Sequence, residues 1–147
     1  MEKTAIIVDA NVILSAAINP RGLTHRKLLA LILDPGITLY TPKYLVEEID
    51  PKIEEIAARK GLKSAELRNA INLLLAIFNT VEDEEYRNHI EHALELVNDP
   101  KDAPYVALAL HLKEKHRQVT ILTYNTNDYK KKELVKVGIR VATPREI

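Results

Sequence analysis

The chain has 147 residues, with 46% hydrophobic and 29% charged side chains, which suits one soluble globular domain with a substantial core. Its 21 basic and 21 acidic residues cancel, so any attraction for nucleic acid must come from local patches. The absence of cysteine excludes disulfides, thiolate metal ligands and thiol nucleophiles, and the lack of a long apolar run or a signal-peptide apolar region leads us to expect a cytoplasmic protein with no membrane partner.

The first predicted element is a buried strand that ends in a carboxylate. Residues 4–8 contain an uninterrupted apolar run, Ala5 to Val8, which is rich in β-branched side chains and typical of a central strand in a parallel sheet. Asp9 follows directly, at the strand end where open α/β sheets bind their ligands. Asp is also a common N-cap, and Asp9 taken alone favours the helix cap over a site.

Apolar periodicity and turn residues divide the rest of the chain into alternating helices and short strands. Thr41 is expected to cap the third helix with Pro42 at its first position, Pro51 to split that helix at Asp50, and Gly138 to end the last helix. The alternation predicts a single domain over residues 1–147, of the α/β class, with three α/β/α layers around a central parallel sheet. Further strands are expected near 37–40, 80–81, 118–123 and 139–142, and helices over 12–18, 23–33, 42–60, 63–78, 82–97, 103–115 and 130–137.

Several acidic residues are expected at the carboxyl edge of this sheet. Asp9 and Asp128 lie just beyond predicted strands, Asp99 and Asp102 open the apolar helix from residue 103, and Glu48 lies in the helix after the second strand. A shared crevice at that edge is consistent with this topology. Since clustered carboxylates repel one another without a cation, and an all-oxygen ligand set suits hard ions, the pattern points to Mg²⁺ or Mn²⁺.

Helical geometry separates Glu48 from its neighbour Glu47. At 100° per residue, Glu48 lies roughly 105° and Glu47 roughly 150° from the centre of the apolar stripe that begins at Leu45. Glu47 is therefore expected in solvent. Glu48 borders the buried face, where it either points into a cleft or extends past the boundary into water.

Asp99 and Asp102 compete for one capping role. Pro104 lacks an N–H and must lie in the first turn of its helix, which favours Asp102 or a residue just before it as the cap. Asp99, which precedes Pro100, would be the cap if the helix began earlier. One carboxylate then has a structural role, and the other is left for a site.

Four segments, taken in order, resemble the PIN-domain family. They are Val8-Asp9-Ala10-Asn11-Val12, Glu48-Ile49, Asp102-Ala103-Pro104-Tyr105-Val106-Ala107-Leu108-Ala109 and Leu122-Thr123-Tyr124-Asn125-Thr126-Asn127-Asp128-Tyr129. The resemblance spans almost the whole chain, from the first strand to the C-terminal tail. It implies a Rossmann-like α/β/α sandwich and a Mg²⁺- or Mn²⁺-dependent ribonuclease acting on RNA.

The resemblance also implies roles for individual residues. Family members carry metal-binding, catalytic acids at the positions of Asp9, Glu48, Asp102 and Asp128, and Asp99 matches an additional acid of one subgroup. Many members have Asp where this chain has Asn125, which removes one charge. Stand-alone prokaryotic PIN proteins of this size are often VapC-type toxins held inactive by an antitoxin. Family members also suggest a homodimer formed through helices, for which the 63–78 helix has apolar surface.

Polar neighbours of the acids have two interpretations each. Asn11 either orients a site water or bonds its own backbone, and Thr123 and Asn125 could position the carboxylates. A basic group beside Asp128 is either a solvated face or a contact for RNA phosphates; it comprises Lys130, Lys131, Lys132 and Lys136. His89 and His92 lie three residues apart, yet no third metal ligand is evident for them.

Three alternatives remain to be weighed against a nuclease. A receiver-type signalling domain needs an acidic pair after the first strand, whereas only Asp9 is present there. A phosphatase of the haloacid type needs a second Asp at the position of Asn11. A degenerate domain that binds RNA or protein without cutting would tolerate Asn125, although the four acids argue against it.

Overall fold

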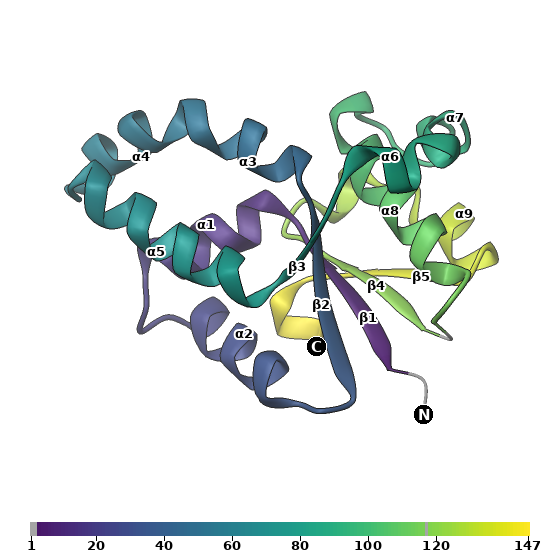
Figure 1. Ribbon diagram of the computed structural model, residues 1–147, viewed down its shortest axis with the longest axis horizontal. Coiled ribbons are helices and arrows are strands. Elements are labelled where there is room, and N and C mark those ends of the chain that lie inside the picture. The colour runs from purple at the N-terminus through teal and green to yellow at the C-terminus, as the bar shows by residue number, and fades with distance from the viewer. Residues whose placement is uncertain (1–2, 117) are drawn as a thin grey trace.

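The structure is a computed structural model that describes residues 3–116 and 118–147, and it is built around a five-stranded parallel sheet (Figure 1). The strand order is β3-β2-β1-β4-β5. The strands are β1 (Thr4–Val8), β2 (Ile37–Pro42), β3 (Asn79–Val81), β4 (Val119–Leu122) and β5 (Ile139–Ala142). All five expected strands are therefore present.

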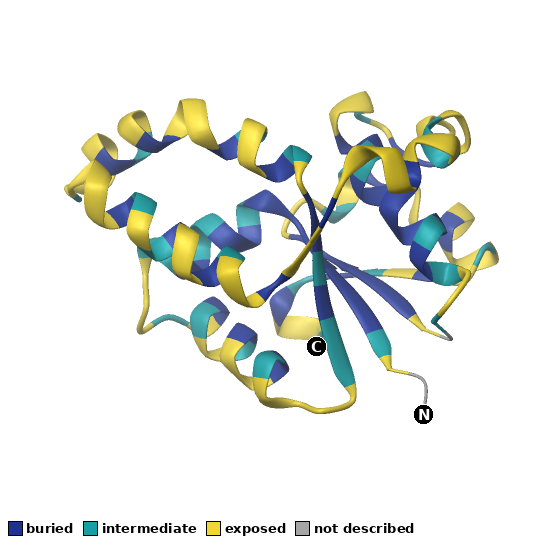
Figure 2. Ribbon diagram, viewed as in Figure 1, coloured by how far each residue is buried: buried dark blue, intermediate teal, exposed yellow. Residues whose placement is uncertain are grey.

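The central strand is β1, which pairs on one side with β2 and on the other with β4. Ile7, for example, lies opposite Tyr40 in β2 and Ile121 in β4. Residues 5–8 are all buried, and Figure 2 shows this part of the sheet enclosed between the helices. Both faces of the strand are covered, which explains the continuous apolar run and confirms the prediction of a central buried strand.

Helices flank the sheet on both sides. Figure 1 shows α1, α2, α4 and α5 on one side and α6 to α9 on the other. Within the described residues, no helix is long and apolar enough to span a membrane. The helices are α1 (Ala10–Ile18), α2 (Leu23–Leu33), α3 (Tyr44–Ile49), α4 (Ile53–Lys60), α5 (Ser64–Ile77), α6 (Asp83–Tyr86), α7 (Ile90–Leu94), α8 (Ala103–Lys113) and α9 (Lys131–Lys136).

Proline and glycine end helices where the sequence indicates. A short 3₁₀ helix, η1 (Asp50–Lys52), contains Pro51 and separates α3 from α4, which confirms the predicted split. Gly138 follows α9 with a φ of 83°, and its N–H donates to the Val135 carbonyl at 3.0 Å. An L residue with a side chain is rarely stable in that left-handed conformation, so glycine is the natural end of the helix.

The prediction for Thr41 and Pro42 is wrong. They do not cap and begin a helix but continue β2, where Pro42 lies opposite Val81 of β3. The Lys43 N–H then donates to the Val81 carbonyl at 2.9 Å, and the helix starts only at Tyr44. Pairing with β3 favours the extended conformation, and Pro tolerates it because its missing N–H is not needed at an edge of the ladder.

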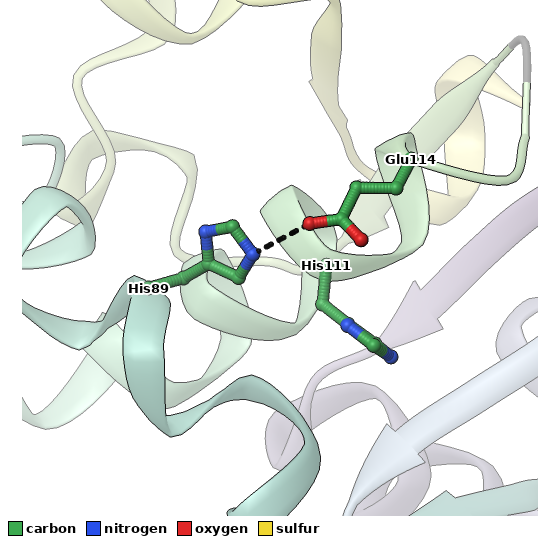
Figure 3. A group of neighbouring side chains, drawn as sticks. All are labelled: His89, His111 and Glu114. Carbon is green, nitrogen blue, oxygen red and sulfur yellow. Dashed lines mark hydrogen bonds and ion pairs between the residues drawn. The ribbon is translucent and has the colours of Figure 1, made fainter.

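The single helix expected over 82–97 is also wrong, because the segment is broken into α6, a 3₁₀ helix η2 (Arg87–His89) and α7. Tyr86 leaves the helical conformation, with φ −119° and ψ 4°, and its buried ring keeps a hydrogen bond from its hydroxyl to Asp83 Oδ1 at 2.7 Å. Tyr86 belongs to α6, which packs against α8, so burial in this tertiary contact overrides the local helical pattern. At the other end of η2, His89 approaches the end of α8 (Figure 3).

The core is centred on α8, whose residues are buried on nearly every side. Its largest fully buried members include Tyr105 and Leu108. This confirms the prediction of a central helix from its nearly uniform apolar sequence. On α5, in contrast, Leu73 and Ile77 are exposed, which leaves the expected dimer surface available but untested.

Candidate metal centre

The fold brings the predicted acids to the carboxyl edge of the sheet. Asp9 directly follows β1, and Asp128 ends a 3₁₀ helix, η4 (Thr126–Asp128), after β4. Asp99 and Asp102 flank the N-terminal start of α8, where η3 (Pro100–Asp102) leads into the helix. Glu48 lies on α3, which follows β2. Each acid is therefore placed by the strand or helix terminus that the topology directs to this edge.

Asp99, Asp102 and Asp128 form the tightest group. One carboxylate oxygen of each lies within 4.8 Å of the others. The two loops that carry them are joined by backbone hydrogen bonds, because the Asn98 N–H donates to the Asp128 carbonyl at 2.7 Å and Val97 forms an antiparallel bridge with Tyr129. The backbone thus holds these three side chains close together before any ligand is considered.

Asp102 is the least satisfied of the three acids. It is only 8% exposed, and its Oδ2 atom is buried without a hydrogen-bond partner among the described residues. Burial, followed by repulsion from the carboxylates of Asp9 and Asp128, raises the pKa of Asp102 to about 8. A buried carboxylate oxygen with neighbouring oxygens and no donor fits a hard divalent cation such as Mg²⁺ or Mn²⁺.

Asp99 takes the capping role. Its Oδ1 accepts the Lys101 N–H at 3.0 Å and caps η3, whereas the Asp102 side chain caps nothing. The preference for Asp102 as the cap is therefore wrong, and the alternative with an earlier helix start is confirmed. The reason is that the 3₁₀ turn at Pro100 begins the helix three residues before α8.

Asp9 is both a cap and a member of the buried polar network. Its Oδ1 accepts the Ala10 N–H at 2.6 Å, and its Oδ2 accepts hydrogen bonds from the hydroxyls of Thr123 at 2.8 Å and Tyr129 at 3.2 Å. Burial raises the pKa of Asp9, and these donors act against that shift because they stabilise its ionised form. Asp9 is thus well supported, although it lies outside the tight group of three.

Glu48 faces the site and Glu47 does not. Glu48 is half-buried and its Oε1 accepts a hydrogen bond from the Tyr105 hydroxyl at 2.8 Å, whereas Glu47 is exposed, as the helical geometry predicts. Burial, and to a smaller extent the neighbouring carboxylate of Asp9, raises the pKa of Glu48. The nearby Tyr105 hydroxyl also acts slightly against the rise in the pKa of Asp9, so Tyr105 influences both acids that stand apart from the tight group.

The sequence did not identify the tyrosines as site residues. Tyr105 lies three residues after Asp102, so the two side chains share a face of the helix. Tyr129 follows Asp128 directly and turns inward while Asp128 lies at the boundary. The helical spacing could have indicated Tyr105, but the inward turn of Tyr129 depends on its bridge to Val97.

The polar neighbours meet at one hydroxyl. Thr123 Oγ1 donates to Asp9 and accepts hydrogen bonds from Asn11 Nδ2 at 3.2 Å and from the Asn125 N–H at 3.1 Å. Asn11 Oδ1 accepts the Tyr124 N–H at 3.1 Å, which ties α1 to the loop after β4. Thr123 and Asn11 therefore position Asp9 through side chains, whereas Asn125 does so through its backbone.

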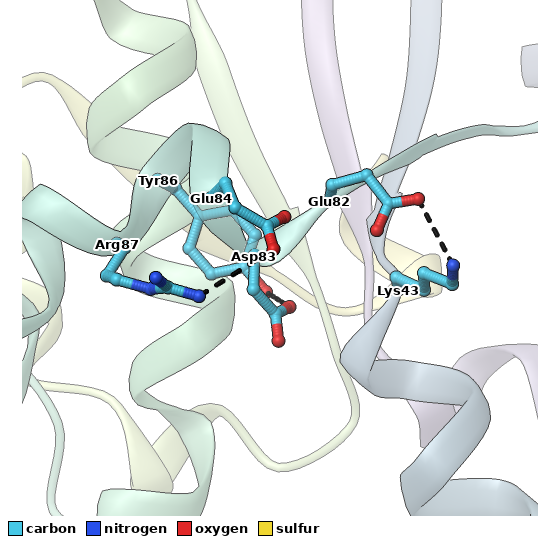
Figure 4. A network of polar contacts seen from close by, with 6 residues as sticks. All are labelled: Lys43, Glu82, Asp83, Glu84, Tyr86 and Arg87. Carbon is cyan, nitrogen blue, oxygen red and sulfur yellow. Dashed lines mark hydrogen bonds and ion pairs between the residues drawn. The ribbon is translucent and has the colours of Figure 1, made fainter.

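A pocket adjoins the acids on the side of α8. Tyr44 packs edge-on against Tyr105 with ring centroids 6.4 Å apart. Lys43 and Glu82, which precede the lining residues Tyr44 and Asp83 in sequence, pair at 3.2 Å (Figure 4). The pocket is lined by Tyr44, Asp83, Tyr86, Arg87, Ile90 and Pro104.

Exposed cations lie on two further flanks of the site. Lys130, Lys131 and Lys132 border a shallow pocket that follows the loop of Asp128. A second groove extends from Asn11 along α1 to two cations on α4; it is lined by Asn11, Leu14, Ser15, Ile18, Asn19, Ile56, Arg59 and Lys60.

A parallel α/β sandwich with acids gathered at the carboxyl edge of its sheet defines a Rossmann-like class of protein with an acidic pocket. Within that class, the chain belongs to the PIN domain family, because the family model described as PIN domain matches residues 7–115. This membership agrees with the acid pattern, which lacks the acidic pair of a receiver-type domain and the second Asp of a haloacid-type phosphatase.

Solved structures agree with this fold. The chain is similar to VapBC2 from Rickettsia felis, solved bound to a DNA fragment from their promoter, with a TM-score of 0.61, 14% identity, and 95% of this chain and 98% of that chain covered. It is also similar to FitAcB from Neisseria gonorrhoeae, with a TM-score of 0.64, 18% identity, and 97% and 99% covered. A comparison with curated proteins finds no match.

Proposed function

We propose that the chain is a Mg²⁺- or Mn²⁺-dependent endoribonuclease that hydrolyses RNA phosphodiester bonds. The observation that carries this proposal is the Asp102 carboxylate, which is buried beside Asp99 and Asp128 with one oxygen that finds no donor among residues 3–116 and 118–147. Such an arrangement is costly without a cation, and family membership supplies the chemical context.

In this proposal Asp9, Glu48, Asp102 and Asp128 are the catalytic acids, and Asp99 joins them as a metal ligand. When bound, the metal supplies charge that activates water and stabilises the phosphate. The chain's own contribution is orientation. Thr123 and Tyr129 hold Asp9, and the Tyr105 hydroxyl holds Glu48, so these carboxylates would be oriented before a cation binds.

The surrounding surface suits an RNA substrate. Lys130, Lys131 and Lys132 are exposed beside the loop of Asp128, and Arg59 and Lys60 line the groove that begins at Asn11. Cations on two sides of an acidic centre can hold the phosphates that flank a scissile bond. Binding through these residues is therefore expected to weaken as the salt concentration rises.

A partner protein is the second part of the proposal. The two similar solved structures carry the names VapBC2 and FitAcB, and we propose that this chain is likewise the toxin of a toxin–antitoxin pair in the cytoplasm. We further propose a homodimer formed through α5, whose Leu73 and Ile77 are exposed.

The test is cleavage of end-labelled RNA, both structured and single-stranded, in the presence of Mn²⁺. Cleavage should be lost on adding a chelator and should fall about 100-fold or more in Asp102→Asn, which removes one charge from the site. Glu48→Gln and Glu47→Gln form a matched pair on one helix, of which only the first should lose activity.

Two results would argue against this assignment. Full activity in Asp102→Asn would mean that the cleavage arises elsewhere. Absence of cleavage in every RNA, together with Mn²⁺ binding that Asp102→Asn abolishes, would instead favour the alternative of a PIN domain that binds RNA or protein without cutting.

A further inference from the structure

The far end of α8 carries a second group of side chains that the nuclease proposal does not use. His111 lies in the last turn of α8, Glu114 follows the helix, and His89 belongs to η2. Figure 3 shows His89 reaching from η2 toward Glu114, with His111 nearby on α8. One ligand atom of each residue lies within 4.8 Å of the other two.

We propose that His89, His111 and Glu114 form a second metal site, which takes a transition-metal ion of the Zn²⁺ type. The site would join η2 to the C-terminal end of α8 and would be separate from the acidic centre at the N-terminal end of that helix.

The chemistry of the donors separates this site from the acidic centre. Two imidazoles and one carboxylate are a donor set that Zn²⁺, Co²⁺ and Ni²⁺ accept, whereas Mg²⁺ prefers oxygen alone. Three protein ligands leave a further position for water. The side chains of His89 and Glu114 are 22% and 57% exposed, so solvent can reach that position.

The distances require little movement. In a tetrahedral site with metal–ligand bonds of about 2.1 Å, neighbouring ligand atoms lie about 3.4 Å apart. His89 Nε2 and Glu114 Oε1 are already 3.0 Å apart, and no pair in the group exceeds 4.8 Å. Because the side chains are not enclosed by the core, rotation about their own bonds can close the remaining distance.

A simple hydrogen bond explains why the side chains of His89 and Glu114 lie close together, but it does not explain why His111 lies beside them. His111 comes from a different element than His89, yet its ring lies with its centroid 6.4 Å from that of His89 and tilted by 53°. His111 and Glu114 are three residues apart, which places both on one face of the helix end toward η2. The geometry thus gathers three ligands from two elements.

Binding would have two measurable consequences. The ion would replace the hydrogen between His89 Nε2 and Glu114, so that a proton is released when that nitrogen was protonated. It would also stabilise the folded chain, because the ligands are assembled only when η2 packs on α8.

Co²⁺ is the probe of choice, because its visible absorption reports the ligand field. In a low-coordinate site with imidazole ligands Co²⁺ absorbs much more strongly than in an octahedral all-oxygen site. The full chain is titrated without a polyhistidine tag and with excess Mg²⁺ to occupy the acidic centre. The variants are His89→Gln, His111→Gln and Glu114→Gln, and the matched control is His92→Gln, an exposed histidine on α7 outside the group.

We expect one strong Co²⁺ spectrum per chain, displaced by Zn²⁺, and a loss of affinity of about 100-fold or more in His89→Gln and His111→Gln. His92→Gln and Asp102→Asn should retain the spectrum. A weak octahedral spectrum in the unmodified chain, or a strong one that survives loss of either His89 or His111, would overturn the proposal. Loss of the spectrum in Asp102→Asn would do the same, because it would assign the ion to the acidic centre.

Discussion

The two ends of α8 hold different kinds of polar cluster. At the N-terminal end, Asp102 is buried among other carboxylates, and one of its oxygens has no donor within the described part of the chain. At the C-terminal end, about 16 Å away along the helix, His89 and Glu114 are solvent-accessible and already hydrogen bonded to each other. Thus α8 carries a buried carboxylate that lacks a hydrogen-bond donor at one end and a hydrogen-bonded, solvent-accessible pair at the other, within the described residues.

Burial makes the largest contribution to this difference, and repulsion among the carboxylates adds to it. The positive end of the helix dipole favours carboxylates near Asp102, yet this effect is smaller than the cost of removing them from water. The groups at the other end stay in water and avoid that cost. A ligand is therefore inferred from the strain at one end of α8 and from the donor set at the other.

The largest expected effect on stability comes from a substitution in the core between the two ends of α8. Leu108 is fully buried near the middle of α8, and Leu108→Ala should lower the free energy of unfolding by about 2–5 kcal/mol because it leaves a cavity. Urea denaturation measures this change. The control is Leu33→Ala, since Leu33 is 80% exposed and its loss should change the stability by less than about 0.5 kcal/mol. Equal effects in both variants would refute the central role of α8.

The strain at the N-terminal end predicts that Asp102→Asn stabilises the metal-free protein. Burial, with repulsion from neighbouring carboxylates, raises the pKa of Asp102 to about 8 in the folded chain, from its ordinary value of 3.8. The folded state therefore retains a proton that the unfolded state has lost, so this contribution is present at low pH and disappears as the pH rises from about 4 through about 8. The full shift corresponds to about 6 kcal/mol at about 1.4 kcal/mol per pKa unit, and the buried amide of Asn keeps part of this cost because it too is removed from water, so Asp102→Asn should stabilise by about 2–4 kcal/mol at pH 8.

The measurement is urea denaturation in chelator at pH 5 and pH 8. The gain from Asp102→Asn should be larger at pH 8, and Glu47→Gln, which changes an exposed acid outside the site, is the matched control. A loss of stability in Asp102→Asn at pH 8 would contradict the strain assigned to this carboxylate.

Removing the hydrogen bond that Thr123 donates to Asp9 should have a smaller effect on stability, again near the N-terminal end of α8. Thr123 is fully buried, and Thr123→Val keeps its shape but removes the hydroxyl that contacts Asp9, Asn11 and Asn125. The free energy of unfolding should fall by about 1–2 kcal/mol, as buried partners lose their hydrogen bonds. Thr123→Ser retains the hydroxyl and should recover most of that loss. Thermal denaturation of the two variants side by side is sufficient.

The smallest effect is expected at the C-terminal end of α8. Glu114→Gln should change the stability of the metal-free protein by less than about 1 kcal/mol, because pairs of exposed groups contribute little. The same denaturation assay, in chelator, measures it. A loss as large as that in Thr123→Val would mean that the histidine cluster is itself a structural element, and that the contrast between the two ends is smaller than their burial suggests.

Local sequence determines most of the fold. The apolar run before Asp9, the alternation of strands with helices, and the orientation of Glu48 rather than Glu47 all follow from periodicity, and the structure confirms them. The failures have a common origin. Thr41 and Tyr86 depart from the predicted pattern because contacts with β3 and α8, which are distant in sequence, outweigh the local preference.

The candidate site shows the same limit. Acids could be assigned to strand ends from topology, but the distances among them, and the hydroxyls of Tyr105 and Tyr129 that hold two of them, arise only from packing. Sequence spacing placed His89 with His92, whereas the fold places it with His111 and Glu114. Residues that meet across two elements leave no periodic signal in either one.

The central position of β1 has a consequence for synthesis on the ribosome. Residues 4–8 emerge before the other strands, and one edge of β1 stays unpaired until β4 is made. The hydroxyls that hydrogen bond to Asp9 belong to Thr123 and Tyr129, which follow it in the sequence by 114 and 120 positions. The nascent chain must keep an apolar strand from aggregating for most of its elongation. By the same order of events, the acidic centre is completed only after Asp128 and Tyr129 have been translated, well over 100 residues after Asp9.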